Sequence, residues 1–209
     1  MYKNIKNLLF DFGGVIVSLD KKNALNAFRD LGIANIEEYL NEFRQSGIFL
    51  EYEEGKLDAP QFYKALRELA GNQDITEEQI DLAWQAFAIG IPDYKYKMLK
   101  ELRKSYNVYL LSNTNPSMAK WMYSEDFSPT KEPIDAFFDK CYLSFEIGHA
   151  KPEKAIYEYI INDSGINPAE TLFFDDGEAN LKAAQELGFQ TYLTDQNEDL
   201  TKVIAQIEK

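Results

Sequence analysis

The sequence predicts an α/β protein: a Rossmann-like parallel sheet flanked by helices, with a helical cap lobe inserted after the first strand. Three observations predict this class. Short apolar runs of strand length recur along the chain, helical patterns separate the later runs, and a long stretch after the first run has helical periodicity alone. Strands that alternate with helices favour parallel pairing through right-handed crossovers.

Five apolar runs are predicted to be buried strands. They span Asn7–Val17, Val108–Leu111, Lys140–Leu143, Thr171–Phe174 and Gln190–Leu193. Apolar residues at helical spacing join the last three runs, and these patterns stop at Gly165 and Gly188. The second half of the chain is therefore expected to consist of strand–helix–strand units.

The stretch from residue 20 to residue 91 is expected to form a helical cap. Its apolar stripes run from Ala24 to Leu31, from Ile36 to Phe43, from Phe62 to Leu69 and from Ile80 to Phe87. Asp58 before Pro60 marks one helix start, and Thr76 with Gln79 fits a capping box at another. Ligands bind at the carboxyl ends of strands in open α/β sheets, and an insertion at this point hangs over that edge. We divide the chain into a core domain, residues 1–19 and 92–209, and a cap domain, residues 20–91.

Composition narrows the range of partners. Lys and Arg number 22 against 35 Asp and Glu, which gives a net charge of -13. This charge repels phosphate backbones and anionic membranes, so neither nucleic acid nor a membrane is expected as a partner. The first residues lack the long apolar segment of a leader, so we expect a cytoplasmic protein. Composition leaves the oligomeric state open.

Polar side chains follow the predicted strands at the points where they end. Asp11 follows the first strand, Ser112 and Asn113 follow the second, and Lys151 precedes a helix after the third. The fourth strand ends in Asp175 and Asp176, with Asn180 shortly after them. The carboxyl ends of parallel strands share one edge of a sheet, so these side chains are expected to converge.

If these side chains converge, their negative charges must be neutralised. Three carboxylates at one place repel each other unless a hard cation with oxygen ligands, such as Mg²⁺, lies between them. Ser112, Asn113 and Lys151 would then supply donors and positive charge for an anion such as phosphate. The sequence therefore predicts a magnesium site beside an anion site.

The order and spacing of these motifs resemble those of the haloacid dehalogenase superfamily over nearly the whole chain. The segments FDFGGVIV, LSNTN, KPE and FFDDGEAN are most similar to one branch. That branch contains bacterial α-D-glucose-1-phosphate phosphatases and the N-terminal phosphatase domain of soluble epoxide hydrolases. The resemblance implies a Mg²⁺-dependent phosphatase of small phosphorylated metabolites, with the inserted lobe as its cap.

The resemblance also implies a role for each matching residue. Asp11 would be the nucleophile that forms an aspartyl-phosphate, and the Gly13 carbonyl and Asp176 would join it around Mg²⁺. Ser112 and Asn113 would hold the phosphoryl oxygens, while Lys151 would neutralise the nucleophile and the transferring group. Asp175 and Asn180 are expected to be supporting polar residues, with Asp175 a candidate outer partner of the metal.

Gly13 departs from the family pattern. Most phosphatases of the superfamily have a second aspartate there, which protonates the leaving group. A general acid contributes about 10²–10⁴-fold, so the enzyme should favour good leaving groups such as sugar 1-phosphates, acyl phosphates and aryl phosphates. His149, the only histidine, is an alternative proton carrier. Two other functions stay open: a 2-haloacid dehalogenase-like hydrolase, and a non-catalytic regulatory protein that binds a phosphorylated ligand.

Overall fold

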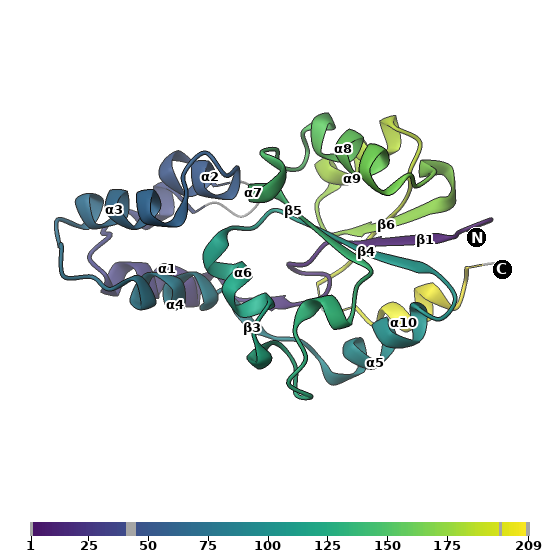
Figure 1. The fold of residues 1–209 in the computed structure, drawn as a ribbon, viewed down its shortest axis with the longest axis horizontal. Helices are drawn as coiled ribbons and strands as arrows, with labels where there is room; N and C mark the ends of the chain where they lie inside the picture. The colour runs from purple at the N-terminus through teal and green to yellow at the C-terminus, as the bar shows by residue number, and fades with distance from the viewer. Residues whose placement is uncertain (1, 41–44, 197, 208–209) are drawn as a thin grey trace.

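A five-stranded sheet forms the centre of the molecule (Figure 1). The computed structural model describes residues 2–40, 45–196 and 198–207. The strands lie in the order β5 (Lys140–Leu143), β4 (Asn107–Ser112), β1 (Asn7–Phe10), β6 (Thr171–Asp175) and β7 (Gln190–Leu193). All four pairings are parallel. The predicted α/β class with a parallel sheet is confirmed.

Helices cover both faces of the sheet (Figure 1). One face packs against α8 (Lys154–Ser164) and α9 (Glu178–Glu186), where Leu9, Leu111 and Ile156 share a buried cluster. The other packs against α5 (Asp93–Leu102) and α10 (Leu200–Ile204), through a cluster that contains Leu8 and Leu99. Because β1 is covered on both sides, every one of its residues is buried.

Shorter elements lie between these. They are α6 (Pro116–Met122), η2 (Glu125–Phe127), η3 (Ile134–Ala136), α7 (Ser144–Ile147) and η4 (Pro168–Glu170). Two of them, α6 and α7, directly follow strands β4 and β5, so they begin at the carboxyl edge of the sheet. No helix within the described ranges combines the length and apolar character that a membrane crossing requires.

The stretch after β1 forms a helical lobe at one end of the molecule (Figure 1). Its elements are α1 (Lys21–Asp30), η1 (Ile36–Glu38), α2 (Gly47–Glu53), α3 (Ala59–Ala70) and α4 (Glu77–Gln85). Capping boxes begin α3 at Asp58 and α4 at Thr76. Aromatic rings fill its interior, with Tyr52 and Phe62 stacked at 4.1 Å between centroids.

This lobe is the region that we expected to be the cap. One buried cluster runs through it and into the sheet, since Phe28 and Trp84 belong to the same cluster as Leu8 and Phe10. The division into a core domain and a cap domain at residues 20 and 91 therefore stays a prediction. Phe43, which we placed in the second apolar stripe, lies outside the described residues.

Two features at the start of the lobe differ from expectation. The first strand ends at Phe10 instead of Val17, because the chain turns: the Phe12 carbonyl accepts hydrogen bonds from the N–H groups of Ile16 and Val17. A short antiparallel ribbon, β2 (Ser18–Leu19) with β3 (Ala88–Gly90), then joins the two ends of the lobe. Strands of two and three residues are too short to show an alternating pattern, so the sequence did not indicate them.

Candidate active site

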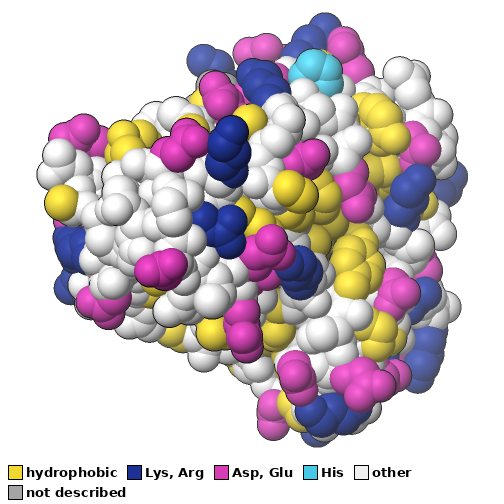
Figure 2. Space-filling view, turned by 60° about the vertical axis from the view of Figure 1, so that its left-hand side comes forward, with side chains coloured by type: hydrophobic (Ala, Val, Ile, Leu, Met, Phe, Trp, Pro, Cys, Tyr) yellow, Lys and Arg dark blue, Asp and Glu magenta, His cyan; other side chains and the backbone are white. Residues whose placement is uncertain are grey.

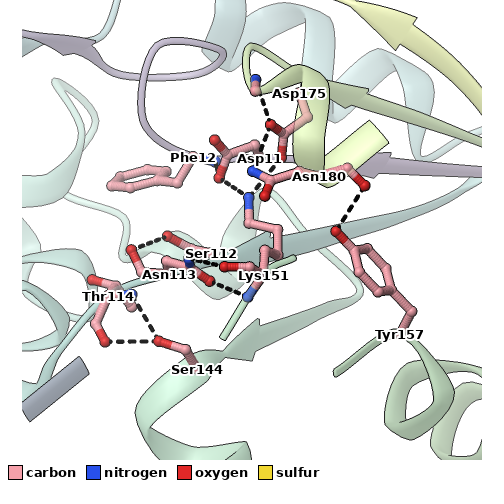
Figure 3. Close-up of polar contacts among 11 residues, drawn as sticks. Asp11, Phe12, Ser112, Asn113, Thr114, Ser144, Lys151, Tyr157, Asp175 and Asn180 are labelled. Atoms are coloured by element: carbon pink, nitrogen blue, oxygen red, sulfur yellow. Dashed lines mark hydrogen bonds and ion pairs between the residues drawn. The ribbon is translucent and has the colours of Figure 1, made fainter. Parts of the chain in front are cut away.

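Four segments bring their polar side chains to the carboxyl edge of the sheet (Figure 3). Asp11 follows β1, Ser112 ends β4 and Asp175 ends β6. Lys151 comes from the segment between α7 and α8. Because β4 and β6 are the two neighbours of β1, these side chains converge around Asp11 as the parallel topology requires.

Lys151 is buried between two carboxylates. Its Nζ lies 2.7 Å from Asp11 Oδ1 and 2.7 Å from Asp175 Oδ2, and its side chain is 2% exposed. Asp11 Oδ1 also accepts a hydrogen bond of 2.6 Å from the Phe12 backbone N–H. Both contacts fall on Oδ1, so among the described residues Asp11 Oδ2 has no protein partner. A carboxylate with one fixed oxygen and one free oxygen is suited to attack or to bind a cation.

The pKa values reflect this crowding. Burial raises the pKa of Asp11, and the nearby carboxylates of Asp175 and Asp176 also raise it. Lys151 acts in the opposite direction and lowers it, and the resulting pKa is about 7. Burial alone would lower the pKa of Lys151, but Asp11 and Asp175 outweigh burial and raise it above its ordinary value. Lys151 therefore stays protonated, while the carboxylates still carry more negative charge than one lysine can balance.

Three carboxylates form a candidate metal centre. Asp11, Asp175 and Asp176 each offer an oxygen, and these oxygens lie within 4.8 Å of one another. With Lys151 protonated, three ionised carboxylates leave two negative charges, which one divalent cation would neutralise. Asp176 is the exposed member of the three, and burial is the main cause that raises its pKa. An all-oxygen donor set of this charge fits Mg²⁺.

Asp175 is already engaged with the protein. Its Oδ2 accepts from Lys151, while Oδ1 accepts from the Gly177 N–H at 2.7 Å and from Asn180 Nδ2 at 2.9 Å. The Asn180 carbonyl in turn accepts from the Tyr157 hydroxyl at 2.9 Å (Figure 3). Asp175 and Asn180 thus occupy positions from which they hold Lys151 and the start of α9.

Asn113 uses its side chain to hold Lys151. Its Nδ2 donates to the Lys151 carbonyl at 2.9 Å, and its Oδ1 accepts from the Lys151 N–H at 2.8 Å. With both amide atoms bonded to one residue, a phosphoryl oxygen would have to be met by the Asn113 backbone N–H. The buried Ser112 hydroxyl, by contrast, makes only a long contact of 3.4 Å to the Asn113 carbonyl.

Ser144 is a polar residue of the site that the sequence reasoning missed. Its buried Oγ lies 2.9 Å from the Thr114 nitrogen, 3.0 Å from the Thr114 carbonyl and 2.6 Å from the Glu53 carbonyl. It therefore links the loop after β4 to the end of α2 in the lobe. The available signal was its position, since a serine directly after a buried strand at this edge has no solvent partner.

The space beside Gly13 is occupied by an apolar side chain. A Cβ placed on Gly13 would lie 2.7 Å from Leu19 Cδ1, so Leu19 fills the region that a side chain at position 13 would enter. His149 lies apart: it is exposed, and its Nδ1 is 3.2 Å from Glu153 (Figure 2). Within the described ranges, His149 makes no hydrogen bond to the residues gathered around Asp11.

Comparison with known proteins gives a consistent assignment. The chain is 45% identical over 195 residues to D-ribitol-5-phosphate phosphatase from Bacteroides thetaiotaomicron, covering 93% of this chain and 94% of that protein. A HAD-like hydrolase structure from Porphyromonas gingivalis matches with a TM-score of 0.91 at 38% identity, over 97% of each chain. A wild-type HAD family enzyme from Bacteroides thetaiotaomicron, crystallised with magnesium and inorganic phosphate, matches with a TM-score of 0.86 at 42% identity, over 95% of this chain and 98% of that one. The model of the haloacid dehalogenase-like hydrolase family matches residues 5–188. The predicted resemblance is thereby confirmed, and the chain belongs to the haloacid dehalogenase-like hydrolases.

Proposed function

We propose that this hydrolase is a Mg²⁺-dependent phosphatase of small sugar, polyol or other organic phosphates, and that Asp11 is its nucleophile. The observation that carries the proposal is the arrangement of Asp11: Lys151 and the Phe12 N–H fix Oδ1, Oδ2 has no protein partner among the described residues, and two further carboxylates lie close by. The name of the similar D-ribitol-5-phosphate phosphatase supports a phosphorylated metabolite as substrate, and the similar structure with magnesium and inorganic phosphate supports a phosphate site.

In this proposal Asp11, Asp176 and the Gly13 carbonyl would hold Mg²⁺. When bound, the ion would supply charge neutralisation, which an anionic phosphate needs in order to approach an anionic nucleophile. Asp175 would act as an outer partner of the metal, because both of its oxygens already accept hydrogen bonds from Lys151, Gly177 and Asn180.

In the proposed reaction each residue of the site has a separate role. The Asp11 carboxylate attacks phosphorus, the bond from phosphorus to the leaving oxygen breaks, and an aspartyl-phosphate forms. Lys151 keeps its proton and balances the charge on the transferring group, while the Ser112 hydroxyl and the Asn113 N–H donate to its oxygens. Water then attacks the aspartyl-phosphate, which releases inorganic phosphate and restores Asp11.

Gly13 affects the protonation of the leaving group. No side chain at position 13 can donate a proton, and Leu19 occupies the adjoining space. We expect good leaving groups to be favoured, with sugar 1-phosphates far better than 6-phosphates of the same sugar. D-ribitol 5-phosphate, named for the similar phosphatase, lies at the other end of the series, because its departing primary alkoxide needs a proton.

One substrate panel tests the proposal. Phosphate release from an aryl phosphate, glucose 1-phosphate, glucose 6-phosphate and D-ribitol 5-phosphate is measured with Mg²⁺ and with excess chelator. The proposal requires turnover that the chelator abolishes. Halide release from 2-chloropropionate, unaffected by chelator, would favour the dehalogenase function instead, and phosphate binding without turnover of any compound would favour a regulatory binding protein.

The distribution of charged side chains indicates which macromolecular partners the protein would repel. On the face that Figure 2 draws, lysines and arginines lie among acidic side chains and do not gather into one basic patch. Together with the net charge of -13, this supports the expectation that neither nucleic acid nor an anionic membrane is a partner.

A further inference from the structure

Helix α5 places a lysine in the protein interior. Lys95 is 1% exposed, and its Nζ donates to the Val15 carbonyl at 2.5 Å and to the Ile16 carbonyl at 3.3 Å. Within the described part of the chain, no carboxylate lies within ion-pair distance of it. A buried ammonium group without a carboxylate is costly. Burial lowers the pKa of Lys95 to about 8, so the group is still largely protonated at neutral pH.

The carbonyls that Lys95 binds belong to the turn after Asp11. Within this turn, the Phe12 carbonyl accepts two backbone N–H groups and the Val17 carbonyl accepts the N–H of Gly14. Val15 and Ile16 are fully buried, and their carbonyls receive their hydrogen bonds from Lys95. A buried carbonyl without a donor is strongly disfavoured, so the conformation of the turn depends on this lysine.

The same turn is in close contact with the candidate metal centre. Gly14 has a φ of 74°, and a Cβ built there would overlap Asp176 Oδ2. The turn is therefore bonded to Lys95 through the Val15 and Ile16 carbonyls, and the Asp176 carboxylate packs against it at Gly14. A shift of the turn would move the Gly13 carbonyl and displace the Asp176 carboxylate together.

We propose that Lys95 is a positioning residue for the metal site, which fixes the turn so that the Gly13 carbonyl and the Asp176 carboxylate meet the ion in one geometry. This inference rests on the proposed function, which assigns Gly13 and Asp176 to Mg²⁺. Lys95 itself touches neither the metal nor the substrate.

Metal binding without substrate tests this role directly. Lys95→Met keeps the length of the side chain and removes its donors. Met98→Ala, on the same helix and also buried, serves as the matched control for lost packing. Mn²⁺ and Mg²⁺ dissociation constants are measured by calorimetry for the native chain and both variants, and thermal unfolding is followed in parallel. We expect Lys95→Met to weaken metal binding on the order of 10-fold, the lower end of the loss typical for a direct partner of a metal ligand, because Lys95 acts on the ligands only through the turn.

The control should lose thermal stability and keep its metal affinity. Equal metal affinity in Lys95→Met and the native chain would overturn the positioning role while leaving the proposed function intact. A native chain that binds no metal would instead overturn the proposed function. If Lys95→Met does not fold, Lys95→Gln keeps one short donor and should show intermediate metal affinity; native affinity in that folded variant would also overturn the role.

Discussion

A carboxylate at position 13 would show whether the missing proton donor determines which substrates the enzyme accepts. A Cβ on Gly13 would meet only Leu19, at 2.7 Å from Cδ1 and 3.7 Å from Cγ. The backbone permits a side chain, because Gly13 lacks the positive φ of Gly14. The obstacle is therefore the flexible tip of one half-buried leucine, and overpacking of this kind costs about 1–3 kcal/mol where it is not relieved. Gly13→Asp combined with Leu19→Ala removes that obstacle.

The size of the effect follows from what a general acid contributes, about 10²–10⁴-fold. A general acid accelerates mainly the reactions of poor leaving groups. An aryl oxide can depart without a proton, whereas a primary alkoxide needs one. We therefore expect the double variant to phosphorylate itself from glucose 6-phosphate about 10²-fold faster than the native chain. Its rate with an activated aryl phosphate should stay close to native. Leu19→Ala alone is the control, since it opens the space without adding a carboxylate.

Rapid-quench measurement of phosphoenzyme formation is the appropriate assay, because hydrolysis of the aspartyl-phosphate can limit steady-state turnover. The logarithm of the rate is plotted against leaving-group pKa for a series of aryl and alkyl phosphates. The native chain should give a steep negative slope, and the double variant a shallower one. A shallow slope in the native chain would refute the reasoning, because another group would then donate the proton; His149→Ala would be the first variant to test as its source.

Three further outcomes are expected. Asp176→Asn should lose Mg²⁺ binding by calorimetry and phosphatase activity with it, and full activity in excess chelator would contradict the metal assignment. Gly14→Ala should weaken Mg²⁺ binding because its Cβ overlaps Asp176, whereas Gly71→Ala, at a similar φ with open space around it, should cost stability alone. Burial raises the pKa of Glu53 to about 8 from 4.5, so the folded state binds a proton that the unfolded state releases between these pH values. Stability should therefore fall as pH rises from 4.5 to 8, by a few kcal/mol at most, and Glu53→Gln should flatten this dependence in thermal unfolding at pH 5 and pH 8.

The part of the site that the sequence predicted is the part fixed by topology. Once the strands are parallel, Asp11, Ser112 and Asp175 must share one edge, whatever their side chains do. The capping box at Thr76 was equally predictable, because both of its partners lie within one turn of the helix. The two-residue strand Ser18–Leu19 was not, since it is too short to carry a pattern.

Contacts between distant residues account for the rest. The amide of Asn113 pairs with the backbone of Lys151, 38 residues later, and Lys95 binds carbonyls about 80 residues earlier. Neither pairing has a local signature: an asparagine after a strand resembles a ligand-binding residue, and Lys95 lies in a helix with two exposed lysines, Lys97 and Lys100. Which charged residue turns inward is decided by what the opposite element leaves unpaired, here two buried carbonyls.

The charges of the site also imply an order in which its occupants bind. When all three are ionised, Asp11, Asp175 and Asp176 exceed Lys151 by two negative charges. Burial opposes the ionisation of Asp11, the proposed nucleophile. A dianionic phosphate entering that field is repelled by the carboxylate that attacks it in the proposed reaction. A divalent cation removes this repulsion and favours the ionised form of Asp11, so metal and phosphate should bind with positive coupling. Gly13 leaves this balance unchanged, because a side chain missing from the leaving-group side adds no charge to it. Loss of the proton donor and retention of the metal site are therefore compatible in one enzyme.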